Sequence, residues 1–168
     1  MDYARDRTCF FTGHRTIPKY ESKNLINRVD RAIDTLASGG YEYFVCGGAV
    51  GFDTLAACRI VVAKRRYPDI GLILALPCRD QTLKWRRTYD ISLYQRLKGY
   101  AADIIYASDV YSSDCMHERN RMMADMSSVC VAYYNGSPGG TAYTVKYARE
   151  VGVRVLNVWG GVKFMPEI

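Results

Sequence analysis

The chain has 168 residues, of which 49% are hydrophobic and 24% charged, and its net charge is +6 at pH 7. This length predicts one domain over residues 1–168, and the apolar content is sufficient for a core without disulfide or metal cross-links. Because the charged residues are spread along the whole chain, disorder is excluded, and the positive charge favours an anionic partner such as a nucleotide, a nucleic acid or a membrane surface.

The cysteines and the N-terminus both indicate an intracellular protein. Six cysteines are present, most of them inside apolar runs, and none forms a C-x-x-C pair, so they are predicted to be reduced and buried. Residues 1–7 carry charges where a signal peptide needs an apolar stretch, and no apolar run reaches membrane-spanning length. The sequence therefore predicts a cytoplasmic protein.

The first part of the chain repeats a unit of strand, loop and helix. An apolar strand is expected at residues 8–11, ending at Gly13, and a helix at residues 20–38. A second strand is expected at residues 43–46, followed by a tight loop and another helix. The apolar positions that recur at helical spacing are Leu25, Val29, Ile33 and Leu36 in the first helix, and Leu55, Cys58 and Val62 in the second.

The rest of the chain continues the alternation. After a third strand at residues 72–76, Asp80 is predicted to cap a helix that runs to Gly99, with Trp85, Tyr89, Leu93 and Leu97 on its apolar stripe. The remaining expected elements are strands at 104–106, 129–133 and 153–158, and helices at 114–126 and 142–151. Short, continuously apolar strands that alternate with helices predict a Rossmann-like three-layer α/β sandwich with a mainly parallel sheet.

Three glycine-containing loops follow predicted strands, at residues 13–15, 47–53 and 136–141. In open α/β sheets, ligands bind beyond the carboxyl ends of the strands. Two of these loops lead directly into helices, whose free N–H groups and dipole favour a phosphate, and glycine permits close approach of the backbone. Neither loop matches G-x-G-x-x-G or G-x-x-x-x-G-K-[ST], so a dehydrogenase or a P-loop hydrolase is not indicated. One such loop is explained by a turn alone, but three favour a binding site.

Two charged side chains near these loops, Asp53 and Arg119, each have two possible roles. Asp53 lies where a helix N-cap is expected, and it can equally accept a hydrogen bond from a ribose or a base. Arg119 and Asn120 are expected to face the core edge and Arg121 the solvent. Arg119 can hold an anion with its planar guanidinium, or form a surface ion pair with Glu118 or Asp125.

Two sets of motifs resemble known families. Met116-His117-Glu118-Arg119, followed after a strand by Pro138-Gly139-Gly140-Thr141, resembles the M-H-x-R-K and P-G-G-x-G-T motifs of the cytokinin-activating phosphoribohydrolases, the LOG or lysine-decarboxylase-like proteins. Nearly the whole chain is similar to the YpsA and YoqJ-type (DUF1273) branch of the SLOG superfamily. The motifs that carry this second resemblance are T-G-H-R at 12–15, G-G-A-V-G-F-D at 47–53, the pair Gln81 and Trp85, and E-R-N-R at 118–121.

The resemblance implies a Rossmann-like fold, related also to the DNA-processing protein DprA, with a pocket for a nucleotide-derived ligand such as an ADP-ribose-like molecule. For the enzyme branch it implies hydrolysis of an N-glycosidic bond by the motif arginine, matched by Arg119, and by a glutamate after the glycine loop. Here Thr141 is followed by A-Y-T-V-K, without an acid, and Asn120 replaces the motif lysine. Since a carboxylate is needed to stabilise the developing charge and to activate water, the catalytic candidates are Asp53, Glu118 and Arg119.

Ligand binding, by a sensor or a sequestering protein, is therefore ranked above hydrolysis, and DprA-like binding of single-stranded DNA comes third. The predicted ligand-binding residues are Gly13, His14, Arg15, Gly47, Gly48, Ala49, Gly51, Asp53, Arg119, Asn120, Gly139, Gly140 and Thr141. No bound cofactor or metal is predicted, since His14 and His117 lack neighbouring ligands at metal-binding spacing. No membrane partner is expected, and a homodimer could form through the side of the helix that carries Met122 and Met126.

Overall fold

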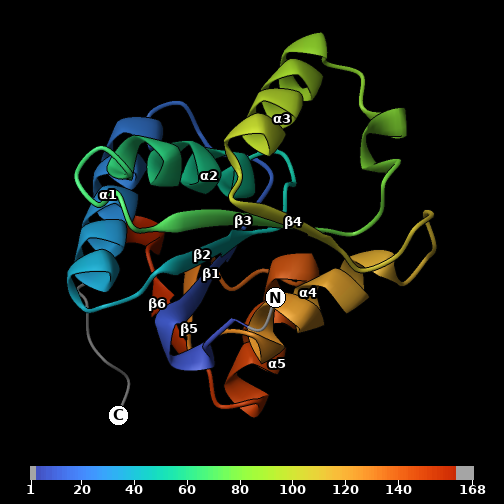
Figure 1. Cartoon of the computed structure of the whole chain (residues 1–168). Coiled ribbons are helices and arrows are strands. Elements are labelled where there is room, and N and C mark those ends of the chain that lie inside the picture. Colours follow the sequence, from blue (N-terminus) through green and yellow to red (C-terminus); the bar gives the residue numbers. More distant parts are fainter. Residues whose placement is uncertain (1–2, 162–168) are drawn as a thin grey trace.

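The computed structural model describes residues 3–161, so residues 1–2 and 162–168 of the predicted domain lie outside the described residues. Six parallel strands form one sheet in the order β4-β3-β2-β1-β5-β6 (Figure 1). The strands are β1 (Thr8–Gly13), β2 (Tyr43–Cys46), β3 (Gly71–Leu76), β4 (Asp103–Tyr106), β5 (Val129–Tyr133) and β6 (Arg154–Asn157). All five strand pairings are parallel, which confirms the predicted fold class.

Helices cover both faces of the sheet. These helices are α1 (Ser22–Ser38), α2 (Phe52–Ala63), α3 (Thr88–Tyr100), α4 (Cys115–Asp125) and α5 (Gly140–Glu150). Helices α1, α2 and α3 lie on one side, and α4 and α5 on the other (Figure 1). Alternate strand residues serve the two layers: Phe11 and Phe44 belong to the core under α1 and α2, and Phe10 and Val45 to the core under α4 and α5. The predicted three-layer sandwich is confirmed.

The strand order reverses between β1 and β5. The chain builds β2, β3 and β4 outward on one side of β1, and then returns to place β5 and β6 on the other side. The carboxyl ends of the two central strands are level, because Gly13 pairs with Tyr133. The loops that leave β1 and β5 therefore face each other across a crevice, which is where open α/β sheets bind ligands.

Helix α2 turns a different face to the core from the one predicted. Its fully buried positions include Ala56, Ala57, Ile60 and Ala63, whereas the predicted stripe of Leu55, Cys58 and Val62 is only half-buried. The helix is apolar nearly all round, so periodicity could not select a face. The small alanines face the sheet, where they allow the helix axis to approach closely.

The predicted helix after β3 is in fact two pieces. A short 3-10 helix, η2 (Gln81–Lys84), precedes a break, and α3 begins only at Thr88. Asp80 makes no capping hydrogen bond with its side chain. The chain leaves the helical path because Trp85 turns back to pack edge-on against Tyr94, with 5.3 Å between the ring centroids.

The six cysteines form no disulfide, and five of them are buried as predicted, while Cys58 is half-buried. Among residues 3–161, no helix has the length and apolarity needed to cross a membrane.

Candidate functional site

A cavity of about 370 Å³ opens at the carboxyl ends of β1 and β5. Four segments line it: the end of β1 with its loop, the loop into α2, the first turns of α4, and the loop that enters α5. Ten of the thirteen predicted ligand-binding residues lie in its wall: Gly13, His14, Arg15, Ala49, Asp53, Arg119, Asn120, Gly139, Gly140 and Thr141. The fold thus brings together residues that are up to about 130 positions apart in the chain, which a parallel sheet does by aligning its strand ends.

Five further lining residues were not predicted: Thr12, Met116, His117, Ser137 and Pro138. Helical spacing could have indicated Met116, because it precedes Arg119 by three positions and so lies on the same side of α4. Ser137 and Pro138 belong to the loop that was predicted, although only its last three residues were named. Thr12, which is 6% exposed at the end of β1, belongs to the T-G-H-R motif, which could have indicated it.

Arg119 and Asp53 form the buried polar floor of the cavity. Arg119 is 4% exposed and Asp53 is 5% exposed. Arg119 donates to the backbone carbonyl of Gly47, and its Nε donates to Oδ1 of Asn120 at 2.7 Å. The alternative of a surface ion pair for Arg119 is therefore wrong, and its expected orientation toward the core is confirmed.

Asp53 is not the N-cap of α2. That position belongs to Gly51, and Asp53 is the second residue of the helix. Its Oδ2 instead accepts the N–H of Ala49 at 3.4 Å, inside the loop. Burial raises the pKa of Asp53 to about 6, although Arg119 and the amide of Ala49 favour its ionised form. Burial also lowers the pKa of Arg119.

The glycines of the loop after β2 face the protein: Gly47, Gly48 and Gly51 do not line the cavity wall, although Ala49 of the same loop does. A Cβ at Gly47 would lie 2.7 Å from Oδ2 of Asp53, and one at Gly51 would lie 2.6 Å from Cα of Arg15. The first N–H of α2, at Phe52, already donates to the carbonyl of His14 at 3.2 Å. Glycine at these positions allows the polar floor and the loop after β1 to pack closely against the loop backbone. Internal packing, and not contact with a ligand, therefore explains why these residues are glycine.

The loop after β5 has the opposite character. Residues 135–140 are exposed, and no atom lies within 4 Å of a Cβ added at Gly139 or Gly140. The first backbone hydrogen bond of α5 is donated by Tyr143 to Gly139. The amides of residues 140–142 therefore have no partner within the helix and open toward the cavity, with the positive end of the helix dipole.

Two histidines and one arginine complete the wall. The N–H of Asn135 donates to Nε2 of His14 at 3.0 Å, so Nδ1 of His14 carries the proton. This bond ties the loop after β1 to the loop after β5. Nδ1 of His117 is buried without a hydrogen-bond partner among residues 3–161. Arg15 is exposed and makes no hydrogen bond or ion pair within the same residues, although its charge helps to lower the pKa of Asp53.

Glu118, a predicted catalytic candidate, does not line the cavity. It is exposed on another side of α4, beside a shallow depression that it forms with Arg121, Met122, Asp125 and Met126. Asp53 is thus the only carboxylate among the cavity-lining residues that the structure describes. Within these residues, no group of three or more His, Cys, Asp or Glu side chains could hold a metal ion.

The chain belongs to the YpsA family of SLOG proteins, because the model of that family, described as the YspA SLOG family, matches residues 10–154. This finding confirms the resemblance seen in the sequence motifs. The chain is also 30% identical over 119 residues to the uncharacterised SPbeta prophage-derived protein YoqJ of Bacillus subtilis (strain 168), and the match covers 64% of this chain and 69% of YoqJ.

Two solved structures of DNA processing protein A (DprA) share the fold. DprA of Streptococcus pneumoniae has a TM-score of 0.66 at 14% identity, and the match covers 95% of this chain and 52% of that one. DprA of Helicobacter pylori, whose structure concerns its binding of single-stranded DNA, has a TM-score of 0.62 at 19% identity, with 88% and 63% covered. The chain thus spans between half and two thirds of these DprA chains. At this identity, the likeness establishes the fold.

Proposed function

We propose that this SLOG-family protein binds a nucleotide-derived ligand in the cavity between β1 and β5, as a sensor or a sequestering protein. The observation that carries the proposal is that the open N-terminus of α5 and the exposed cation of Arg15 line one cavity, at the reversal of strand order. This combination suits an anionic ligand whose phosphate the backbone can approach closely.

The phosphate is assigned to the loop after β5. Gly139 and Gly140 have no side chains that would block the amides, and the hydroxyl of Thr141 lies beside them in the wall. Arg15 reaches the cavity from the facing loop and supplies the charge. A phosphate held by backbone amides and one arginine receives charge-assisted hydrogen bonds, which are about twice as strong as neutral ones.

The ribose and base are assigned to the remaining residues of the cavity wall. Asp53 and Asn120, which both line the cavity, offer a carboxylate and an amide to ribose hydroxyls. His14, Met116 and His117 offer ring and thioether surfaces for a base. The volume of about 370 Å³ is near the lower end of the range for small-molecule sites, which fits a mononucleotide or one half of an ADP-ribose-like molecule.

Mass spectrometry of ligand extracted from the purified protein, together with thermal shifts against AMP, ADP, NAD and ADP-ribose, tests this assignment. A bound nucleotide at about 100 times its Kd is expected to stabilise the fold by about 2.7 kcal/mol. Arg15→Ala should weaken its binding by about 1.5–3 kcal/mol, while Lys146→Ala, on the outer side of α5, should not. If no nucleotide shifts the protein and none is extracted, the proposal is wrong.

A second candidate is hydrolysis of the N-glycosidic bond of such a ligand. The position of Asp53 favours it, since this carboxyl is the single acid of the cavity and its pKa of about 6 suits proton transfer near neutral pH. Incubation with the nucleotide panel should then release free base, and Asp53→Asn should abolish the release while nucleotide binding persists. Binding without any released base would remove this candidate.

A third candidate, binding of single-stranded DNA, is favoured by exposed aromatic and basic residues around η2, at the start of α3 and in the loop before α4. Four large apolar side chains are more than half exposed there: Leu83, Tyr89, Val110 and Tyr111. The ammonium of Lys84 in η2 lies 4.5 Å from the ring centre of Tyr111 in the loop before α4, and this contact joins the two segments. Arg86 and Arg87, close to Lys84 in the sequence, are also exposed. Bases stack on such rings while cations neutralise phosphates.

Fluorescence anisotropy with oligothymidine tests the third candidate. Affinity should fall steeply with salt, and Tyr111→Ala should lose about 1–3 kcal/mol of stacking. An absence of binding at low salt would exclude it.

A further inference from the structure

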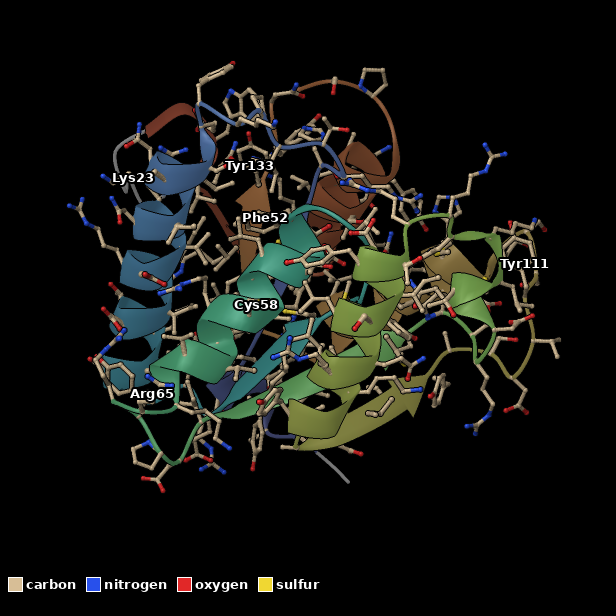
Figure 2. The ribbon with its side chains drawn as sticks, turned by 90° about the horizontal axis from the view of Figure 1, so that it is seen from above. Lys23, Phe52, Cys58, Arg65, Tyr111 and Tyr133 are labelled. Atoms are coloured by element: carbon tan, nitrogen blue, oxygen red, sulfur yellow. The ribbon has the colours of Figure 1, made fainter. Side chains whose placement is uncertain are left out.

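A second cavity, of about 520 Å³, lies between α2 and α3. It shares no residue with the cavity at β1 and β5, so it does not depend on the proposed nucleotide site. Cys58 projects into it from α2, on the side that faces α3 (Figure 2). We refer to this cavity as the α2–α3 groove.

The floor of the α2–α3 groove is apolar because of how α2 packs. The alanines of α2 face the sheet, which leaves Val61 and Val62 half-buried at the outer side of the helix. Across from them, α3 contributes Leu93 and Leu97. Helix α3 has only two buried residues, Tyr94 and Leu97, so it covers α2 incompletely. An uncovered apolar strip remains between the two helices.

The rim of the α2–α3 groove is cationic. Lys64, Arg65 and Arg96 line it, and no acidic residue does. Within residues 3–161, these three side chains have no ion-pair partner. Two neighbouring arginines, by contrast, do have ion-pair partners. Arg59 of α2 pairs with Asp30 at 2.7 Å, and Arg66 after α2 pairs with Asp34 at 2.6 Å.

Unpaired cations at the edge of an apolar floor attract a molecule that has an anionic head and an apolar body. The volume of the groove lies within the range for small-molecule ligands. Its apolar wall on α3 extends only from Leu93 to Tyr100, which is about 10 Å along the helix axis. Since the anchors of a docked protein helix can span a similar length, the cationic rim, and not the length of the wall, favours a small anion.

We propose that the α2–α3 groove binds a small amphipathic anion, an aliphatic chain that bears a carboxylate or a phosphate. The chain lies on Val61, Val62, Leu93 and Leu97, and the head group meets the cations of Arg65 and Arg96.

Cys58 provides the readout for a test on the intact protein. It is half-buried in the groove, whereas the other five cysteines are buried, so N-ethylmaleimide should label Cys58 selectively in the folded state. Decanoate and decyl phosphate, both below the concentration at which micelles form, should slow this labelling in proportion to occupancy. Decyltrimethylammonium, which has the same chain and the opposite charge, should not slow it.

Charge reversal on the rim separates anion recognition from apolar contact. Arg96→Glu, at an exposed position of α3, should weaken decanoate binding by about tenfold or more, the effect of losing a charge-assisted hydrogen bond. Arg65→Glu should act in the same direction, and Lys146→Glu, on α5 at the opposite face of the sheet, should have no effect. Circular dichroism verifies that each variant is folded.

Three results would overturn the proposal. The first is an absence of protection by either anion. The second is equal protection of Cys58 by decanoate and by the uncharged decyl maltoside, since the cations would then not discriminate between anionic and uncharged ligands. The third is protection by a synthetic helix of leucine and glutamate repeats but not by decanoate, which would assign the groove to a segment of a partner protein.

Discussion

The two glycine-rich loops, 47–51 after β2 and 136–141 after β5, look alike in sequence and differ in the structure. Both follow a buried strand and lead into a helix. In the first loop the carbonyls of Gly47 and Gly48 accept hydrogen bonds from the buried side chains of Arg119 and Gln81. In the second loop, Gly139 and Gly140 are exposed, with nothing near their Cβ positions. Glycine therefore serves internal packing in one loop and leaves open space in the other.

The largest expected effect is at Gly51. Its φ is +84°, and a Cβ would lie 2.6 Å from Cα of Arg15, so Gly51→Ala combines backbone strain with a clash. We expect it to lower the free energy of unfolding by about 4 kcal/mol or more, as measured by urea denaturation. Gly139→Ala is the matched control, because its φ is +138° but its surroundings are empty, and it should cost only about 1–2 kcal/mol. Equal losses in the two variants would refute the difference between the loops.

Removal of Arg119 should have the next largest effect. Arg119→Ala leaves the carboxyl of Asp53 buried without its cation and the carbonyl of Gly47 without its donor, which should cost about 3–5 kcal/mol of stability. Arg15→Ala, in the same cavity, should change the free energy of unfolding by less than about 0.5 kcal/mol, since Arg15 is exposed and unpaired. Chemical denaturation measures the free energy of unfolding of both variants. An Arg119→Ala variant as stable as the parent chain would contradict the structural role of Arg119.

The pH dependence of stability tests the burial of Asp53. Its pKa of about 6 in the folded protein is above that of an unfolded aspartate, about 3.9. The folded state therefore holds the proton more tightly, and stability should fall as the pH rises from about 4 through about 6. Relative to Asp53→Asn, the parent chain should lose about 2–3 kcal/mol over this interval. Parallel stability curves for the two proteins would show that the carboxyl is solvated.

The smallest effect on stability is expected at Gly140, the first residue of α5. No atom lies within 4 Å of its Cβ position and its φ is not positive, so Gly140→Ala should leave stability unchanged or raise it by up to about 1 kcal/mol. The added methyl group should nevertheless weaken nucleotide binding, because it occupies space that the proposed phosphate needs. A thermal-shift titration measures both quantities, and unchanged nucleotide affinity would place the phosphate elsewhere.

Most of the fold could be predicted from short-range patterns. Strand β2 was predicted with the bounds that the structure has, and all four apolar positions of α1 are buried. The failures occur where a local pattern is ambiguous. Helix α2 is apolar on several sides, so its buried face depends on which neighbour accepts small residues. The break before α3 depends on the contact between Trp85 and Tyr94, which no periodicity encodes.

The candidate site was predictable to the extent that its residues lie on strand-end loops or on one helix face. Arg15, Arg119 and Gly140 line the cavity because parallel strands bring their carboxyl ends to one edge. Thr12 and His117 were not selected, although both belong to the motifs T-G-H-R and M-H-E-R, because their place in the wall depends on how α4 and β1 approach each other. Glu118 was selected as a catalytic candidate, but the rotation of α4 turns it away from the cavity.

Periodicity and turn residues were sufficient to predict the alternating strands and helices, the parallel sheet and the edge of the sheet where the cavity lies, because these follow from local propensity and from the burial of apolar strands. The different roles of the two glycine loops come from contacts between segments far apart in the chain. Arg119 reaches back 72 positions to the carbonyl of Gly47 and fills the space beside the first loop, whereas no side chain does so at the second. The physical reason is that a glycine permits close approach by anything, and only its neighbours in space determine what approaches.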